Sequence, residues 1–386
     1  MRYGSRTINP PVSGIREMFE LADQYDDVIN LCIGESGFPT PRNVIEAGRE
    51  GLLKGYTKYT PNAGVPALRE ALSEKLEREN HIKADPQKQI IVTAGGVEAV
   101  LLAILATVDE GDEVLVPCPY WPDYPEQIRL AGGRIREVPT YEKDGFIPLA
   151  DTIQKYITER TRVLILNSPN NPTGAVIPRE ELEKIRDLAV QYDLTVISDE
   201  PYERLVYDSR GHVSIGSLEG MGERTITANT FSKTYAMSGW RVGYACGPEK
   251  IIQAMILLKE QTSSSVNACA QYACIEALKN TDRQVKEMVS QYRQHRDFMV
   301  SKLNECRRIS CRKPEGAFYV FVNIQETGMT SYELAKKILK EVKVVVTPGT
   351  GFGKYGEGYI RISCGPSMEE LERAANRLSV FFSGME

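Results

Sequence analysis

Histidine is scarce in this sequence, and cysteine is too scattered to build a framework. Only three histidines occur in 386 residues, and none has a partner at the spacing that a metal site requires. We therefore expect no metal site, and we do not expect histidine to act as the main general base. The eight cysteines form no C-x-x-C pair, and a chain of this length does not need disulfides, which favours reduced, mostly buried thiols.

Three other features are missing, and each excludes a class of partner or location. No apolar run approaches the roughly 18 residues of a membrane span, and the first residues, MRYGSRTINPPVSG, lack the apolar centre of a signal peptide. The net charge is −5 and no stretch is strongly basic, so nucleic acid is not an expected partner. We expect a cytoplasmic protein that binds neither membranes nor nucleic acid.

The composition and the hydrophobic pattern favour an α/β fold. With 42% hydrophobic and 26% charged residues, the chain is typical of a globular protein with two domains or one large α/β body. Several short runs are almost wholly apolar, as expected of strands buried on both faces, and amphipathic stretches such as residues 178–193 lie between them. This alternation predicts a parallel sheet covered by helices. The expected strands are residues 89–95, 112–117, 162–169, 194–200 and 224–230.

The pattern changes after about residue 290, where we expect a second, smaller α/β domain. A long charged helix over residues 283–305 is followed by strand-like and helical runs that suggest hairpin-like pairs. No repeat, low-complexity tract or flexible linker occurs in the chain. We expect an N-terminal segment, 1–45, that packs with the small domain, a large domain, 46–290, and a small C-terminal domain, 291–386.

Polar and aromatic residues follow the expected strands at their C-terminal ends, where parallel sheets bind ligands. Each one alone has a plain explanation as a turn, a packing ring or a helix cap. Together they offer an amine, a carboxylate, a flat ring, hydroxyls, a guanidinium and an anion-binding helix N-terminus. That set fits a flat, phosphorylated, nitrogen-containing aldehyde that a lysine holds as a Schiff base. The residues are Gly95, Gly96, Trp121, Asn171, Asp199, Tyr202, Thr230, Ser232, Lys233 and Arg241.

The stretch TFSKTYAMSGWRVGY, residues 230–244, resembles the lysine signature of class I/II pyridoxal-phosphate-dependent aminotransferases. The resemblance covers nearly the whole chain and falls within the aspartate-aminotransferase-like group of fold type I. It implies a large domain with a mostly parallel sheet of the seven-stranded type, and a smaller α/β domain built from both termini. It also implies the cofactor pyridoxal 5′-phosphate and a homodimer with shared active sites. Other landmarks that match in order are residues 34–41, 58–72, 170–174, 198–202, 314–321 and 359–363.

The resemblance further implies catalytic roles. Lys233 would hold the cofactor as a Schiff base and then carry a proton between two carbon atoms. Asp199 would keep the ring nitrogen protonated, which makes the ring an electron sink. Tyr202 and Asn171 would hydrogen-bond the phenolic oxygen of the ring. The substrate α-carboxylate would be bound by Arg361, with help from Asn171 and the backbone of Gly34.

The remaining implied roles concern cofactor binding. Trp121 would stack on the ring face and line the substrate pocket, and Tyr59 would reach the phosphate bound by the neighbouring subunit. The resemblance also implies cis peptide bonds before Pro119 and Pro172. The phosphate would be held by Gly95, Gly96, Val97, Thr230, Ser232 and Arg241.

Two departures from the family pattern bear on the substrate. Ser36 and Gly37 alter the usual opening G-E-P-D-F, and Val97 stands where members that prefer acidic substrates often place a basic residue. We therefore expect a neutral or aromatic L-amino acid as donor and 2-oxoglutarate as acceptor, in a ping-pong mechanism. The alternatives are a lyase or synthase on the same fold, such as a C–S lyase, and a non-catalytic binding protein.

One motif match is misleading. Residues 351–356, GFGKYG, fit the dinucleotide-binding pattern G-x-G-x-x-G letter for letter. That pattern requires a helix directly after it, whereas a strand, 359–363, is expected here. We therefore interpret the segment as a turn that presents Arg361.

Overall fold

A seven-stranded sheet forms the larger part of the protein. The computed structural model describes residues 14–207 and 211–385. Neighbouring strands of this sheet are parallel, except that β8 runs antiparallel to both β2 and β7. In spatial order the strands are β2 (Ile90–Thr93), β8 (Gly243–Cys246), β7 (Thr225–Thr230), β6 (Thr195–Asp199), β5 (Thr161–Asn167), β3 (Glu113–Cys118) and β4 (Arg134–Pro139).

The α/β fold and the mostly parallel sheet expected from the sequence are confirmed, and so are the strands expected from apolar runs. The apolar pattern does not predict β4 or β8. The sequence of β4, RIREVP, carries three charged residues because this strand lies at the edge of the sheet and is partly exposed. The sequence of β8, GYAC, is short and contains no β-branched residue.

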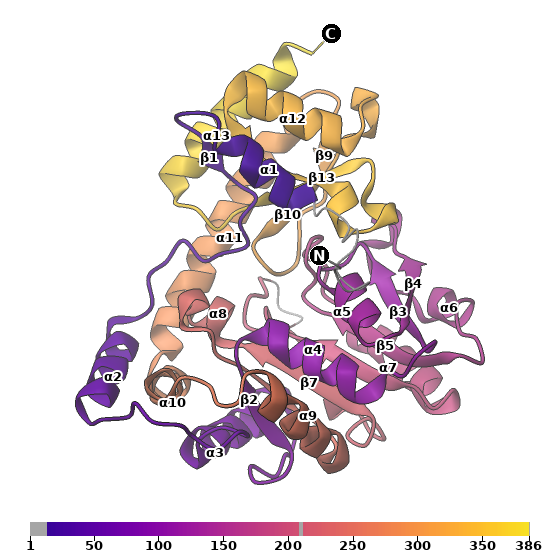
Figure 1. Ribbon diagram of the computed structural model, residues 1–386. Coiled ribbons are helices and arrows are strands. Elements are labelled where there is room, and N and C mark those ends of the chain that lie inside the picture. Colours follow the sequence, from indigo (N-terminus) through magenta and orange to yellow (C-terminus); the bar gives the residue numbers. More distant parts are fainter. Residues whose placement is uncertain (1–13, 208–210, 386) are drawn as a thin grey trace, which may run out of the picture.

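Helices cover both faces of the sheet (Figure 1). Successive side chains of a strand point to opposite faces, so each strand packs against helices on both sides. The helices next to the sheet are α4 (Gly96–Thr107), α5 (Tyr124–Leu130), α6 (Ala150–Gln154), α7 (Arg179–Gln191) and α9 (Glu249–Thr262). Ile165 and Ile197 pack in one core cluster with residues of α4 and α9. Leu164 and Val196 pack in another, with residues of α6 and α7. The strands are therefore apolar on both sides, and polar side chains gather at their ends.

Four more helices belong to the larger part, and one of them contains Lys233. Two of the four, α2 and α10, pack closely against each other. Another of the four, α8, is a single turn directly after β7, so Lys233 lies at a strand end, as the sequence predicts. The four are α2 (Arg42–Leu53), α3 (Pro66–Lys75), α8 (Phe231–Thr234) and α10 (Ala268–Asn280).

The smaller part combines residues from both ends of the described chain. Its four-stranded antiparallel sheet has the order β12-β13-β10-β9, and β1 of the N-terminal region pairs in parallel with β11. The long helix α11 runs from the larger part into the smaller one (Figure 1). These elements are α1 (Gly14–Ala22), β1 (Ile29–Asn30), α11 (Asp282–Asn304), β9 (Ser310–Cys311), β10 (Tyr319–Asn323), α12 (Ser331–Val342), β11 (Val344–Val345), β12 (Thr347–Pro348), β13 (Tyr359–Ser363) and α13 (Met368–Ser383).

Local sequence signals explain where the helices of the smaller part begin. Helix α12 starts with a reciprocal capping box between Thr330 and Glu333, and α13 starts with the same arrangement between Ser367 and Glu370. The segment GFGKYG forms short 3₁₀ turns, η7 (Gly349–Phe352) and η8 (Lys354–Gly356), and leads into strand β13. The interpretation of this segment as a turn rather than a dinucleotide motif is confirmed.

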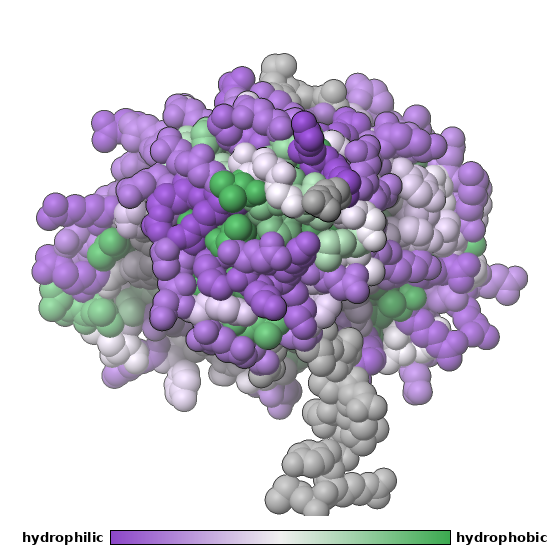
Figure 2. All heavy atoms as spheres, turned by 90° about the horizontal axis from the view of Figure 1, so that it is seen from above, coloured by the Kyte–Doolittle hydropathy of each residue, from purple (hydrophilic) through white to green (hydrophobic). Residues whose placement is uncertain are grey.

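The outer face of the smaller part is predominantly hydrophilic, with only small hydrophobic groups (Figure 2). Among residues 14–207 and 211–385, no helix is long and apolar enough to cross a membrane. The domain boundaries at residues 45 and 290 stay predictions, and part of the segment 1–45 lies outside the described residues.

Candidate active site

A cavity of about 370 Å³ lies at the C-terminal ends of the parallel strands, between the larger and smaller parts. It brings together residues that the sequence places up to 329 positions apart, from Cys32 to Arg361. Of the sequence-predicted site residues, the cavity is lined by Gly34, Gly96, Val97, Trp121, Asn171, Asp199, Tyr202, Thr230, Ser232, Lys233, Arg241 and Arg361. Gly95 adjoins it as the N-cap of α4, whereas Tyr59 lies elsewhere and is 93% exposed.

Lys233 projects into this cavity from α8. Thr230 caps the turn, because its side-chain oxygen accepts a hydrogen bond from the backbone N–H of Ser232. The Lys233 ammonium donates to the carbonyl oxygen of Gly34, which lies on the N-terminal segment. Burial of the amine, followed by repulsion from Arg361, lowers its pKa from that of ordinary lysine to about 8. The neutral, nucleophilic fraction of this amine near physiological pH is therefore much larger than that of an ordinary lysine, although the protonated form still predominates.

The N-terminus of α4 and Arg241 form a cradle for an anion. The first N–H groups of a helix have no partner within the helix and carry the positive end of its dipole. Gly95 has φ +86°, and a Cβ there would lie 2.6 Å from Nη2 of Arg241, so only glycine lets the guanidinium approach. A Cβ at Gly243 would lie 2.5 Å from the carbonyl carbon of Gly95. With the Thr230 and Ser232 hydroxyls on the cavity wall, this geometry suits a phosphate.

Asp199 ends β6 and is only 6% exposed. Its Oδ2 accepts a hydrogen bond of 2.5 Å from the Tyr124 hydroxyl, and its backbone oxygen accepts from the Asn167 amide. Burial raises the pKa of the carboxyl to about 7; the Tyr124 hydrogen bond opposes this rise, and the negative charge of Glu200 adds to it. Oδ1 has no hydrogen-bond partner among the described residues, so this oxygen is available to a ligand.

Arg361 lies in β13 and is 3% exposed. Its guanidinium lies between two aromatic rings, 4.4 Å from the ring centre of Tyr319 and 4.8 Å from that of Phe352. Nη1 donates to Oδ1 of Asn171 at 2.8 Å, and Nη2 donates to the carbonyl oxygen of Cys32. Nε is buried and has no hydrogen-bond partner in the part of the chain that the structure describes. A buried, fixed guanidinium with an unused donor is suited to bind a carboxylate.

Sequence reasoning does not identify Tyr319 and Asn167, which line the cavity, or Tyr124, which lies beside Asp199. Tyr124 supports Asp199, and Tyr319 forms a hydroxyl pair with Tyr202 at 2.8 Å. Asn167 holds the segment before Asn171, because its Oδ1 accepts the backbone N–H of Asn171. Tyr124 lies in the aromatic loop CPYWPDY and Tyr319 in GAFYVF, so both stretches carried a signal, but not one that distinguishes a packing ring from a functional hydroxyl.

The loops that carry Trp121 and Asn171 both contain cis peptide bonds. The bonds Cys118–Pro119 and Asn171–Pro172 are cis, as the resemblance implies, and this prediction is confirmed. Ser168–Pro169 is also cis, which the sequence reasoning did not foresee.

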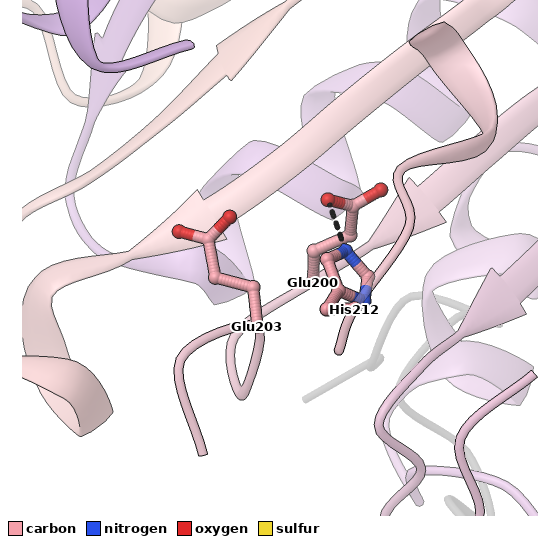
Figure 3. Close-up of side chains that lie close together, drawn as sticks. All are labelled: Glu200, Glu203 and His212. Carbon is pink, nitrogen blue, oxygen red and sulfur yellow. Dashed lines mark hydrogen bonds and ion pairs between the residues drawn. The ribbon is translucent and has the colours of Figure 1, made fainter. Parts of the chain in front are cut away.

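A second polar cluster begins at Glu200, the residue after Asp199, and its charged side chains pair with one another. In the described part of the chain, Glu200, Glu203 and His212 are the one group whose potential metal-ligating atoms lie within 4.8 Å of one another (Figure 3). The Lys75 ammonium donates to Glu203, and the Ser214 hydroxyl donates to Glu200 at 2.5 Å. A buried ammonium thus already neutralises the cluster, which favours a structural role.

Charge pairing in this cluster outweighs its burial. Figure 3 shows the imidazole of His212 facing the carboxylate of Glu200, with Nε2 2.9 Å from Oε2. Burial alone would raise the pKa of Glu200, but His212, Ser214 and Ser198 hold it below its usual value. Burial would likewise lower the pKa of His212, but Glu200 raises it above its usual value. The pairing therefore favours the carboxylate form of Glu200 and the protonated form of His212.

The residues present fit pyridoxal phosphate. The unused Nε of Arg361, the free Oδ1 of Asp199, the desolvated amine of Lys233 and the glycine-lined cradle each match one group of the cofactor or its substrate. The donor set offers cations for a phosphate and a carboxylate, an anion for a ring nitrogen, and an amine for an aldehyde.

Comparisons with known proteins agree with this geometry. The family model described as aminotransferase class I and II matches residues 26–378. An aspartate aminotransferase from Pyrococcus abyssi is 46% identical over 96% of this chain and 95% of its own. Aromatic-amino-acid aminotransferase 2 from Thermococcus litoralis is 44% identical over 96% of this chain and 95% of its own. The structure of the aspartate aminotransferase from Thermus thermophilus with maleate superimposes with a TM-score of 0.93 and 40% identity, covering 98% of this chain and 100% of that one.

Proposed function

The chain belongs to the aminotransferase class I and II family, and on this basis we propose that it uses pyridoxal 5′-phosphate to transfer an amino group from an L-amino acid to 2-oxoglutarate in a ping-pong cycle. That it is an aminotransferase follows from relatives that are 40–46% identical over nearly their full lengths. The cofactor is supported by one observation above the others. A lysine amine whose pKa is lowered to about 8 lies in one cavity with Asp199 and Arg361.

Each part of the reaction needs a different group from the chain. Bound pyridoxal phosphate would supply an aldehyde that links to an amine and a ring that withdraws electrons from the substrate Cα. Lys233 would give its neutral amine to that linkage and, once released, would take the proton from Cα. The Asp199 carboxylate would hold a proton on the ring nitrogen, because its Oδ1 is free to accept it. Arg361 would orient the substrate through its α-carboxylate, with the Asn171 amide beside it.

The cofactor would be held in place by residues that surround these groups. Arg241 and the N–H groups of Gly96 and Val97 would bind the phosphate, with the hydroxyls of Thr230 and Ser232. Trp121 would cover one ring face, and Tyr202 would donate to the phenolic oxygen. Gly34 is required as glycine, because a Cβ there would lie 2.3 Å from the Tyr319 hydroxyl.

The active unit in this proposal is a homodimer. Tyr59, 93% exposed, lies close in sequence to Leu52 and Leu53, which are 55% and 76% exposed. Such large exposed hydrophobic side chains favour a surface covered by another subunit. Tyr59 would then extend to the phosphate site of that subunit. A cytoplasmic location stays a prediction from the sequence.

The donor in this proposal is neutral or aromatic. Val97, 41% exposed, presents an apolar side chain to the cavity, where a basic residue would favour an acidic substrate. The curated relatives include both an aspartate and an aromatic-amino-acid aminotransferase. The proposal is tested by supplying the cofactor and 2-oxoglutarate with a panel of amino donors and measuring glutamate formation. Release of ammonia and pyruvate without glutamate would instead indicate a lyase.

A further inference from the structure

Five charged residues among the described ones line the active-site cavity, and the proposed reaction uses four of them. Arg361, Arg241, Lys233 and Asp199 have a carboxylate, a phosphate, an aldehyde and a ring nitrogen as proposed partners. The fifth, Asp123, has no such partner. Its side chain makes no hydrogen bond or ion pair with any residue of the described chain. Asp123 is the N-cap residue of α5, but its side chain makes no capping hydrogen bond.

Asp123 lines the part of the cavity that is open to solvent. Asp123 is exposed, as are Ile33 and Val97, at 42% and 41%. Since these residues line the cavity and also meet solvent, they mark its mouth. Gln127 ties Asp123 to Val97, because its side-chain amide donates to the Val97 carbonyl at 3.1 Å while its backbone N–H donates to the Asp123 carbonyl at 3.0 Å.

The Asp123 carboxylate is a hydrogen-bond acceptor that no donor of the described chain contacts. Pro122 and Trp121 precede it on the cavity wall, so its neighbours there are apolar. The protein around the carboxylate removes part of its hydration and raises its pKa, and no nearby cation opposes that rise. A donor group brought by a ligand would restore the lost hydrogen bonds.

We propose that Asp123 is a specificity-determining residue, and that the side-chain subsite formed by Ile33, Val97, Pro122 and Asp123 selects amino acids with an apolar stem or ring that ends in a hydrogen-bond donor. This inference rests on the proposed function, because it names the substrate class of the same site. The donor is the hydroxyl of a phenolic side chain or the cation of a long basic one. The same carboxylate repels a second carboxylate and so weakens the binding of dicarboxylates, the acceptor 2-oxoglutarate included.

The test uses acids that lack an α-amine, so that they bind without reacting. Two matched pairs probe the donor: 3-(4-hydroxyphenyl)propionate against 3-phenylpropionate, and 5-guanidinopentanoate against hexanoate. Maleate probes the repulsion of a dicarboxylate. Dissociation constants are measured by calorimetry on the protein loaded with cofactor, for the unchanged chain, Asp123→Asn, Asp123→Ala and the control Glu126→Gln. Glu126 lies in α5, the helix that follows Asp123, and pairs with Arg129, but it does not line the cavity.

The unchanged protein should bind the donor-bearing acid of at least one pair about tenfold more tightly than its partner, since hydrogen bonds to charged groups are of that strength. The pair that responds identifies the tip as phenolic or cationic. Asp123→Ala should abolish the preference, and Asp123→Asn should tighten maleate binding about tenfold. The inference would be overturned if, in both Asp123 variants, the ratio of dissociation constants within each acid pair stayed within twofold of its value in the unchanged protein. It would also be overturned if Glu126→Gln changed these ratios to the same extent.

These outcomes separate the inference from the proposed function. If the protein transaminates but Asp123 variants leave every ratio unchanged, the inference fails and the proposed function stands. If the binding preferences follow Asp123 while no donor yields glutamate, the proposed function fails and the subsite stands. Steady-state kcat/KM for tyrosine against phenylalanine, and for arginine against norleucine, should follow the binding ratios in an active enzyme.

Discussion

Asp199 and Glu200 are neighbours in the chain and both are buried, yet their surroundings affect their pKa values in opposite directions. Asp199 receives a single side-chain hydrogen bond, and its pKa is raised to about 7. Glu200 faces His212, Ser214 and Ser198, which hold its pKa below the usual value. Burial penalises both carboxylates, so the partners decide the outcome: Glu200 has the charge of His212 and three hydrogen-bonding side chains, whereas Asp199 has the Tyr124 hydroxyl. One carboxylate is left ready for a ligand, and the other is already neutralised by the protein.

The same contrast separates the two regions around these residues. On the cavity side, Arg361 has an unused donor and Lys233 has a lowered pKa. On the opposite side, Lys75 and Glu203 satisfy each other. We infer that the cavity side determines activity and the Glu200 side determines stability, and four substitutions test this division.

The largest effect is expected for Lys233→Ala. The rate of transamination should fall at least about a thousandfold, because both the covalent link and the carrier of the Cα proton are lost. Thermal unfolding should stay at the same temperature or rise, because a desolvated amine has been removed. Steady-state kinetics and calorimetry measure the two. A variant that turns over at the original rate would refute the catalytic role.

The next effect concerns stability and is expected for Glu200→Ala. This substitution leaves the His212 imidazolium without its anion, so the free energy of unfolding should fall by about 3 kcal/mol. The rate per folded molecule should fall less than tenfold. Urea unfolding measures the change, with Glu183→Ala as the control, since Glu183 pairs with Arg179 at the surface. Equal stability losses in the two variants would remove the distinction between the regions.

The substitution Asp199→Asn should show the reverse pattern. Its neutral amide cannot hold a proton on a ring nitrogen, so the rate should fall about a hundredfold. The free energy of unfolding should stay within about 1 kcal/mol, because the carboxyl has one side-chain partner. The matched control is Asp193→Asn, at an aspartate that is 94% exposed. A large loss of stability with little loss of rate would place Asp199 with Glu200 instead.

The smallest of the four effects is expected for Tyr124→Phe. The Tyr124 hydrogen bond lowers the pKa of Asp199, so its loss should raise that pKa above about 7. The carboxylate is then present only at higher pH, and the acidic limb of the pH–rate profile should move upward, with about a tenfold lower rate at pH 7. Tyr192→Phe, at a partly exposed ring, is the control. An unshifted acidic limb would show that Tyr124 merely packs.

The sequence predicts the parts of this molecule that depend on local patterns. Apolar runs identify the buried strands, and the residues after each strand identify most of the cavity, because parallel strands bring their ends together. The prediction fails where a residue acts through a distant partner. Tyr124 and Asp199 are 75 positions apart, and Lys75 and Glu203 are 128 apart. No local pattern indicates that such side chains meet.

Sequence reasoning also fails at the edge of the sheet and at residues on the surface of the subunit. Strand β4 is partly exposed, so its charged residues hide it from a pattern built on burial. Tyr59 was assigned to cofactor binding only through the family resemblance, and a single chain leaves it on the surface. Asp123 was not singled out, because an aspartate before a short helix has the form of an ordinary cap.

The central claim is that the Lys233 amine is the group that links to the cofactor, and that it reacts because its pKa is low. The direct measurement is to mix the cofactor-free protein with pyridoxal phosphate from pH 6 to 11, reduce with borohydride, and locate the modified lysine by mass spectrometry. The amine loses its proton as the pH rises through its pKa, so the initial rate of modification at Lys233 should rise with a midpoint near pH 8. Modification spread over surface lysines, or a Lys233 midpoint near that of free lysine, about 10.4, would contradict the account.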